Sequence, residues 1–95
     1  MQIKFSNQMI EWRGPAPFFY VPVPQELSDQ IKQTAKLVSY GWGVIPVIGV
    51  IGQTAFTTSL FPKDGVYLVP VKNAVRLPEK LELGQTVAVS LEVNL

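Results

Sequence analysis

The tripeptide Val-Pro-Val occurs twice in this chain, at Val21–Val23 and at Val69–Val71, an offset of 48 residues. The order of the expected elements repeats with it: each half reads strand, Pro/Gly turn, strand ending in Val-Pro-Val, helix, glycine and strand. Two such halves can pair about a pseudo-twofold axis and close a barrel that leaves few strand edges unprotected. The repeat therefore predicts a single mostly-β domain over residues 1–95, a six-stranded β-barrel made of two β-β-α-β halves, about 1–50 and 51–95.

Side-chain periodicity assigns the individual elements. Apolar residues alternate with small or polar ones from Val87 to Asn94, which is typical of a half-buried strand. Four apolar residues spaced as one helical stripe follow Pro24: Leu27, Ile31, Ala35 and Val38. We therefore expect one long helix over about residues 25–39 and one short helix over about residues 72–78.

The first strand contains an apparent change of phase. Ile3 and Phe5 share one face of an extended chain, whereas Ile10 and Trp12 share the other. If all four side chains faced the core, the strand would have to shift by one residue between the two pairs. The sequence accordingly predicts a β-bulge across Asn7-Gln8 inside one long strand.

Composition excludes several classes of function. The chain contains neither cysteine nor histidine, so thiol nucleophiles, zinc ribbons, Ser-His-Asp triads and histidine-ligated metals are ruled out. The seven carboxylates are scattered along the chain, and we expect no metal, no cofactor and no enzymatic activity.

Charge and hydropathy suggest where the protein acts and what it contacts. The net charge of +1 disfavours strong non-specific binding to nucleic acid. The longest apolar run, Val44–Ile51, is far shorter than the roughly 20 residues of a membrane-spanning helix. The N-terminal residues show no secretory pattern, and we expect a cytoplasmic protein that makes no membrane contact.

Two tryptophans lie beside Gly/Pro turns. Trp12 and Arg13 stand at the mouth of one turn, where they could stack on or clamp an anionic ligand, or else plug a barrel end and bond turn carbonyls. Trp42 lies between two glycines, where it could form the wall of a small-molecule pocket or pack in the core after the helix.

The strand expected over Val44–Ile51 has no polar face. A strand with one side in water should alternate between apolar and polar residues. Either the long helix covers its outer side, or a second copy of the chain does so in a homodimer.

Lys63, Lys72 and Arg76 form the main basic cluster of the sequence. Lys72 and Arg76 are four residues apart, on one face of the short helix, and Lys63 lies at a hairpin tip. The cluster could hold a phosphate or another anion, or could be an ordinary solvated positive surface.

Three segments carry a family resemblance: Glu11–Pro17, Gly41–Val47 and Ser59–Arg76, together with Leu83-Gly84 and the final strand. With these motifs the chain resembles a small prokaryotic family of domains of unknown function. That family also occurs fused to, or near, YdeI/OmpD-associated (bacteriocin-protection-like) proteins. The resemblance implies a double-split β-barrel, a fold shared with the swapped-hairpin proteins AbrB, MazE and MraZ.

AbrB-type proteins build their barrel from two chains and bind DNA, so the resemblance also suggests a function. A duplicated chain would build the barrel alone, and the dimeric DNA-reading surface does not transfer automatically. The favoured hypothesis is a non-enzymatic binding or interaction module, with AbrB-like DNA binding through Lys63, Lys72 and Arg76 as the alternative. An enzyme that relies on Lys, Tyr, Ser and carboxylates is the second alternative.

Overall fold

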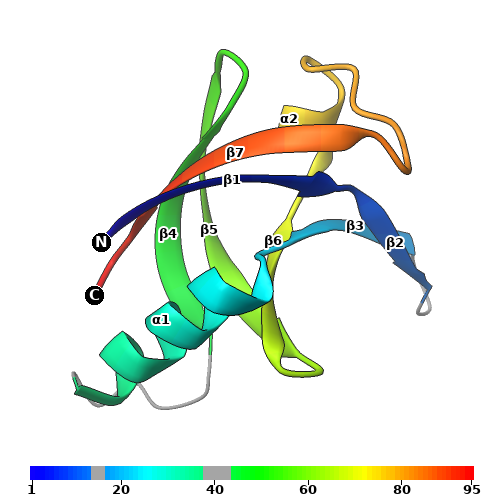
Figure 1. Ribbon diagram of the computed structural model, residues 1–95. Coiled ribbons are helices and arrows are strands. Elements are labelled where there is room, and N and C mark those ends of the chain that lie inside the picture. Colours follow the sequence, from blue (N-terminus) through cyan, green and yellow to red (C-terminus); the bar gives the residue numbers. More distant parts are fainter. Residues whose placement is uncertain (14–16, 38–43) are drawn as a thin grey trace.

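The structure is a computed structural model that describes residues 1–13, 17–37 and 44–95. It contains seven strands: β1 (Gln2–Gln8), β2 (Ile10–Arg13), β3 (Pro17–Pro22), β4 (Ile45–Ile51), β5 (Thr54–Lys63), β6 (Val66–Pro70) and β7 (Thr86–Val93). All seven belong to one antiparallel sheet in the order β1-β7-β4-β5-β6-β3-β2. The sheet curls into a half-barrel, with β1 and β7 crossing in front of β4, β5 and β6 (Figure 1).

The expected mostly-β architecture is confirmed, but the sheet has seven strands and not six. The extra strand arises because the N-terminal segment divides at Met9 into β1, which pairs with β7, and β2, which pairs with β3. Two hydrogen bonds hold the junction between β1 and β2 in place: the Met9 N–H donates to Gln85 O at 2.9 Å, and the Met9 carbonyl accepts from Gly84 N–H at 2.9 Å. β1 and β2 stand at opposite ends of the strand order, so the chain itself joins the two ends at Met9.

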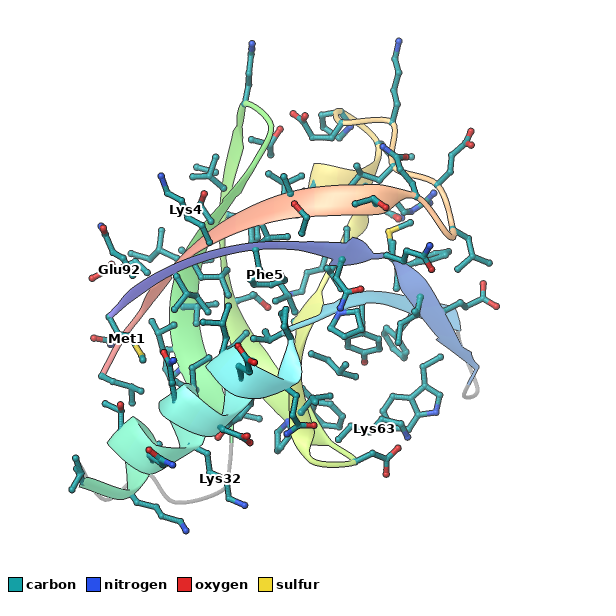
Figure 2. The ribbon with its side chains drawn as sticks, in the orientation of Figure 1. Met1, Lys4, Phe5, Lys32, Lys63 and Glu92 are labelled. Atoms are coloured by element: carbon teal, nitrogen blue, oxygen red, sulfur yellow. The ribbon has the colours of Figure 1, made fainter. Side chains whose placement is uncertain are left out.

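The predicted bulge across Asn7-Gln8 is wrong. Burial alternates without a break from Gln2 to Trp12, and β1 keeps a regular register with β7 as far as Gln8. Ile3 and Met9 face the interior, and Phe5 points from β1 into it (Figure 2). Ile10 and Trp12 therefore face outward, and no change of phase is needed.

Two helices complete the described part of the fold. α1 (Gln25–Leu37) lies below the sheet (Figure 1) and buries Ile31 and Ala35, two members of the predicted stripe. α2 (Asn73–Arg76) is shorter than the predicted 72–78, buries Val75 and contacts β5. The last two residues of the predicted long helix, 38–39, lie outside the described residues.

β3 and β6 pair through the two Val-Pro-Val segments. Val21 lies directly opposite Val69. The pairing continues on either side, because Val23 N–H donates to Tyr67 O at 2.8 Å and Val71 N–H donates to Phe19 O at 2.9 Å. These two bonds are equivalent under the 48-residue offset, which maps residue 23 onto 71 and residue 19 onto 67.

The outer side of β4 is not covered by α1, so the first of the two alternatives for this strand, cover by the long helix, is wrong. β4 alternates strictly between buried and exposed residues although it contains no polar side chain. Ile48 is 57% exposed, and Val44 and Val50 are exposed beside it. We call Val44, Pro46, Ile48 and Val50 the aliphatic face.

Ser28 joins α1 to β6 and is the one buried polar residue of the described chain. Its Oγ donates to Val23 O at 3.0 Å and accepts from Tyr67 N–H at 3.1 Å. Val23 and Tyr67 also bond to each other where the two Val-Pro-Val segments pair. The Ser28 hydroxyl therefore bonds to a second backbone group of each residue, next to the start of α1.

We expect Ser28→Ala to lower the free energy of unfolding by about 1–3 kcal/mol, because it leaves a buried N–H and a buried carbonyl without their partner. Urea unfolding followed by far-UV circular dichroism measures the change. Ser6→Ala on the exposed side of β1 is the control, with an expected change below about 0.5 kcal/mol. Equal stability of the two variants would contradict the role assigned to Ser28.

Candidate functional site

The outer side of β2, β3, β5 and β6 carries a group of large rings. Trp12 lies opposite Phe18 in the β2–β3 ladder, and side-chain alternation puts Tyr20 on the same side. Phe61 and Lys63 face the same way from β5, because Phe61 pairs with Leu68 and not with the inward-facing Tyr67. We call Trp12, Phe18, Tyr20, Phe61 and Lys63 the aromatic face.

Three of these rings contact one another. The Trp12 ring centroid is 6.1 Å from that of Tyr20 and 5.7 Å from that of Phe61, with tilted planes. Tyr20 and Phe61 are more nearly parallel, at 6.3 Å and 21°. These separations lie in the range that aromatic pairs prefer. Leu68 lies between Pro22 and Phe61 in the ladders and faces outward, yet it is only 3% exposed.

Large apolar surface nevertheless remains open to solvent here. Phe18 is 56% exposed, Ile10 39% and Trp12 38%. Scattered exposed apolar residues are normal on a protein surface, whereas a contiguous group marks an interaction site. The three residues lie on the neighbouring strands β2 and β3, so they form such a group.

Lys63 brings a positive charge to the same face. Its Nζ lies 3.6 Å from the centroid of the Trp12 ring, within the range of a cation–π interaction. Figure 2 shows Lys63 beside the β5–β6 turn, at the lower end of the sheet. The ammonium group is thereby held against the aromatic face instead of extending into water.

Two grooves flank the end of β6. The first, of about 380 Å³, is lined by residues of β3 and of the β6–α2 junction: Phe18, Phe19, Tyr20, Pro70, Val71, Lys72 and Asn73. The second, of about 250 Å³, lies on the β5 side and is lined by Ala55, Phe56, Thr57, Thr58, Pro70, Lys72, Ala74 and Val75. Pro70 and Lys72 line both, so Lys72 stands between an aromatic groove and a threonine-lined one.

Proline explains why the second groove opens. Val71 directs its N–H to β3, and N–H groups alternate between the two sides of a strand, so position 70 faces β5. Pro70 has no N–H to donate in that direction. The β5–β6 ladder accordingly stops at Phe61–Leu68, and the earlier part of β5 separates from β6.

Arg76 has a different environment from the two lysines. Its Cζ lies 4.8 Å from the ring centroid of Phe19, and its Nη2 donates to Asn73 Oδ1 at 3.1 Å. Its Nε is buried and finds no acceptor among the described residues. The guanidinium thus packs behind the first groove and fixes the Asn73 amide, which lines it.

The structure brings some of the sequence-predicted site residues together and separates others. The Trp12 ring contacts the Lys63 ammonium group. Trp12 lies on the outer face of the sheet and does not plug a barrel end. Lys72 and Arg76 both border the first groove, Lys72 directly and Arg76 through Phe19. Arg13 ends β2, and Trp42 lies outside the described residues.

Sequence reasoning missed Phe18, Tyr20 and Phe61. The signal that could have found them is the alternation itself, since Val21 and Val23 predict an inward phase that turns Phe18 and Tyr20 outward. The outward direction of Phe61 follows from the register between β5 and β6, which cannot be read from the sequence alone.

The remaining chemistry of the described chain is limited. Burial raises the pKa of the Tyr67 hydroxyl above its usual value, so this inward-facing residue stays protonated at neutral pH. Within residues 1–13, 17–37 and 44–95, no three carboxylates gather as metal ligands. Neither described helix has the length and apolar character needed to cross a membrane.

The contact between Lys63 and Trp12 can be measured by a double-mutant cycle. We expect Lys63→Met and Trp12→Leu to show a coupling free energy of about 0.5–1 kcal/mol in urea unfolding, the range of an exposed cation–π pair. Lys4→Met, on the outer side of β1 and remote from Trp12 in the strand order, is the matched control and should show no coupling. Equal coupling in both cycles would mean that the contact contributes nothing.

Comparison with known proteins identifies a family. A search of curated proteins finds no match to this chain. The family DUF1905, described as a domain of unknown function, matches residues 5–91, which include every strand of the sheet in whole or in part. Because the match spans most of the chain, the protein belongs to the DUF1905 family of domains of unknown function.

Proposed function

We propose that this protein is a non-enzymatic binding module and that its ligand binds on the aromatic face and in the groove beside it. The observation that carries the proposal is the open aromatic surface around Phe18, which continues into a groove of about 380 Å³. Small-molecule sites are concave, mostly apolar and contain a few well-placed polar groups. The first groove combines three rings with Lys72 and Asn73 and has this character.

The absence of catalytic chemistry in the sequence supports a binding role. Cysteine and histidine are lacking throughout the chain. The buried hydroxyl of Ser28 is committed to two backbone groups and is not placed to attack a substrate. An enzyme that relies on Lys, Tyr and Ser remains the weaker alternative, because a lysine base must be desolvated and Lys72 is exposed.

We propose further that the fold is a duplicated double-split barrel related to AbrB. Three features support this: the opposition of Val21 and Val69, the two equivalent hydrogen bonds beside that pair, and the start of each helix. Ser28 N–H donates to Pro24 O and Arg76 N–H to Lys72 O, and the same offset of 48 relates these bonds. An association with YdeI/OmpD-associated proteins is part of the same proposal.

AbrB-like binding of duplex DNA is the second candidate, and Lys72 is the observation that favours it. This exposed cation borders both grooves. Arg76 of the predicted cluster supports it less, since its guanidinium packs against the Phe19 ring. The net charge of +1 also provides little of the electrostatic attraction on which duplex binding depends.

We also propose that the aliphatic face pairs with a second copy of the chain. A twofold interface must be self-complementary, and an uncharged strand face meets that requirement without opposing like charges. In the ladders Ile48 lies between Thr57 and Glu92, and Val50 lies between Ala55 and Ser90, so Glu92 is the one charged residue directly opposite either of them.

The binding proposal is tested with an anionic aromatic probe, 8-anilinonaphthalene-1-sulfonate, in an amide NMR titration. We expect saturable shifts at Phe18, Tyr20 and Lys72. Phe18→Ala should weaken binding roughly tenfold, because truncating a contacting ring costs on the order of 1.4 kcal/mol.

Ile48→Ala is the matched control, because Ile48 and Phe18 are almost equally exposed, at 57% and 56%. It should leave the affinity unchanged. Shifts that are absent, or that respond equally to both substitutions, would argue against a site on the aromatic face.

The homodimer proposal predicts that Ile48→Lys produces a monomer. A lysine at position 48 of each copy places like charges across the twofold axis and adds a long solvated side chain to the apolar contact, which should weaken association at least about tenfold. Light scattering at several concentrations gives the mass, and Phe18→Lys is the control that should leave it unchanged. A wild-type chain that is monomeric at high micromolar concentration would rule the interface out.

A further inference from the structure

We propose that the ligand of the aromatic face is single-stranded nucleic acid, with bases stacked on exposed rings and phosphates bound by Lys63 and Lys72. This inference rests on the proposed binding function and specifies its ligand. It follows from the pairing of two kinds of group on one surface, flat aromatic rings and cations.

The rings provide stacking platforms on a sheet. Single strands bind proteins by stacking successive bases on aromatic side chains, and every base has a face that can stack. Phe18 is the most exposed ring at 56%, and Tyr20 lies two residues along the same strand, on the same side. Trp12 stands opposite Phe18 on β2, so the platform extends over two strands.

The backbones of the two lysines lie at opposite ends of β6, and the ammonium group of Lys63 reaches over the Trp12 ring. Lys63 lies opposite Val66, at the first residue of β6, and Lys72 follows the end of β6 in extended backbone. Val66 and Lys72 are six residues apart in extended chain, a distance of about 20 Å. A strand lying along β6 would therefore meet a cation at each end and rings between them.

The grooves beside Lys72 suit a nucleotide. None of the described residues that line the two grooves is an aspartate or glutamate, so no carboxylate in these walls opposes a phosphate. The first groove, of about 380 Å³, lies in the size range of small-ligand sites. Asn73, oriented by Arg76 Nη2, adds an amide that can hydrogen-bond to a base edge.

The same features favour a single strand over a duplex. In a duplex the base faces are stacked on one another, and proteins read it by placing a helix or a two-stranded ribbon in the major groove. The rings described here lie on the broad outer side of a sheet, and α2 is only four residues long.

The experiment is fluorescence anisotropy of the pure full chain with a labelled thymidine decamer at several salt concentrations. We expect saturable binding whose log K falls with log salt by a slope of about −1.4, since each phosphate contact on a single strand contributes about −0.7. Lys72→Ala should reduce the slope to about −0.7, and Phe18→Ala should weaken binding roughly tenfold with the slope unchanged. Ile48→Ala should change neither quantity. Amide NMR spectra show whether each variant is folded. If Phe18→Ala does not fold, the salt slope of Lys72→Ala, a substitution at an exposed residue, decides the test.

Any of four outcomes would overturn the inference. If the decamer fails to bind while the sulfonate probe still binds at Phe18, the ligand is wrong and the binding function stands. If neither binds, both fail together. If a duplex of the same length binds as tightly as the single strand, or if Lys72→Ala leaves the salt slope unchanged, single-strand recognition by this face is excluded.

Discussion

Every strand of the curled sheet can turn only alternate side chains toward the interior, and the whole surface chemistry of the molecule depends on this constraint. The chain is 47% hydrophobic, and the strands carry more apolar residues than one interior face can hold. Val69 and Val89 fill the interior, while Phe18, Trp12 and Ile48 remain outside. The exposed apolar residues are therefore a consequence of strand geometry, and they gather into faces because neighbouring strands keep the same phase.

The pairing of β3 with β6 decides where those faces lie relative to the grooves. Val21 opposite Val69 fixes the register, and this register brings Tyr20 opposite Pro70. Pro70 ends the ladder with β5, so the sheet separates at the place where the aromatic face begins. Pro70 therefore affects the two ladders differently. Pairing with β3 continues past it, because that ladder uses the backbone groups of the flanking valines. Pairing with β5 stops, because it would need an N–H that Pro70 lacks.

Strict periodicity is what made parts of this fold predictable from sequence. The helical stripe through Ile31 and Ala35 and the alternation of the last strand each have a single structural interpretation. The predicted bulge depends on Trp12 facing the core, as an apolar ring in a strand commonly does, and the regular alternation of burial through Trp12 removes the need for it. The contact of Trp12 with Lys63 depends on the register of four strands, and local patterns contain no information about it.

The two exposed faces differ in chemistry, and this difference argues for different partners. The aliphatic face offers apolar side chains without a cation of its own, which suits a self-complementary contact. The aromatic face combines flat rings with Lys63, and Lys72 lines the groove beside it. Thr57 and Thr58 separate them, since they line both the groove beside Lys72 and a cavity of about 310 Å³ beside Ile48. A second copy seated on the aliphatic face would consequently lie against the outer wall of the groove beside Lys72. Association of two chains and occupation of that groove would then share one strand, β5, so each would alter the surface that the other uses.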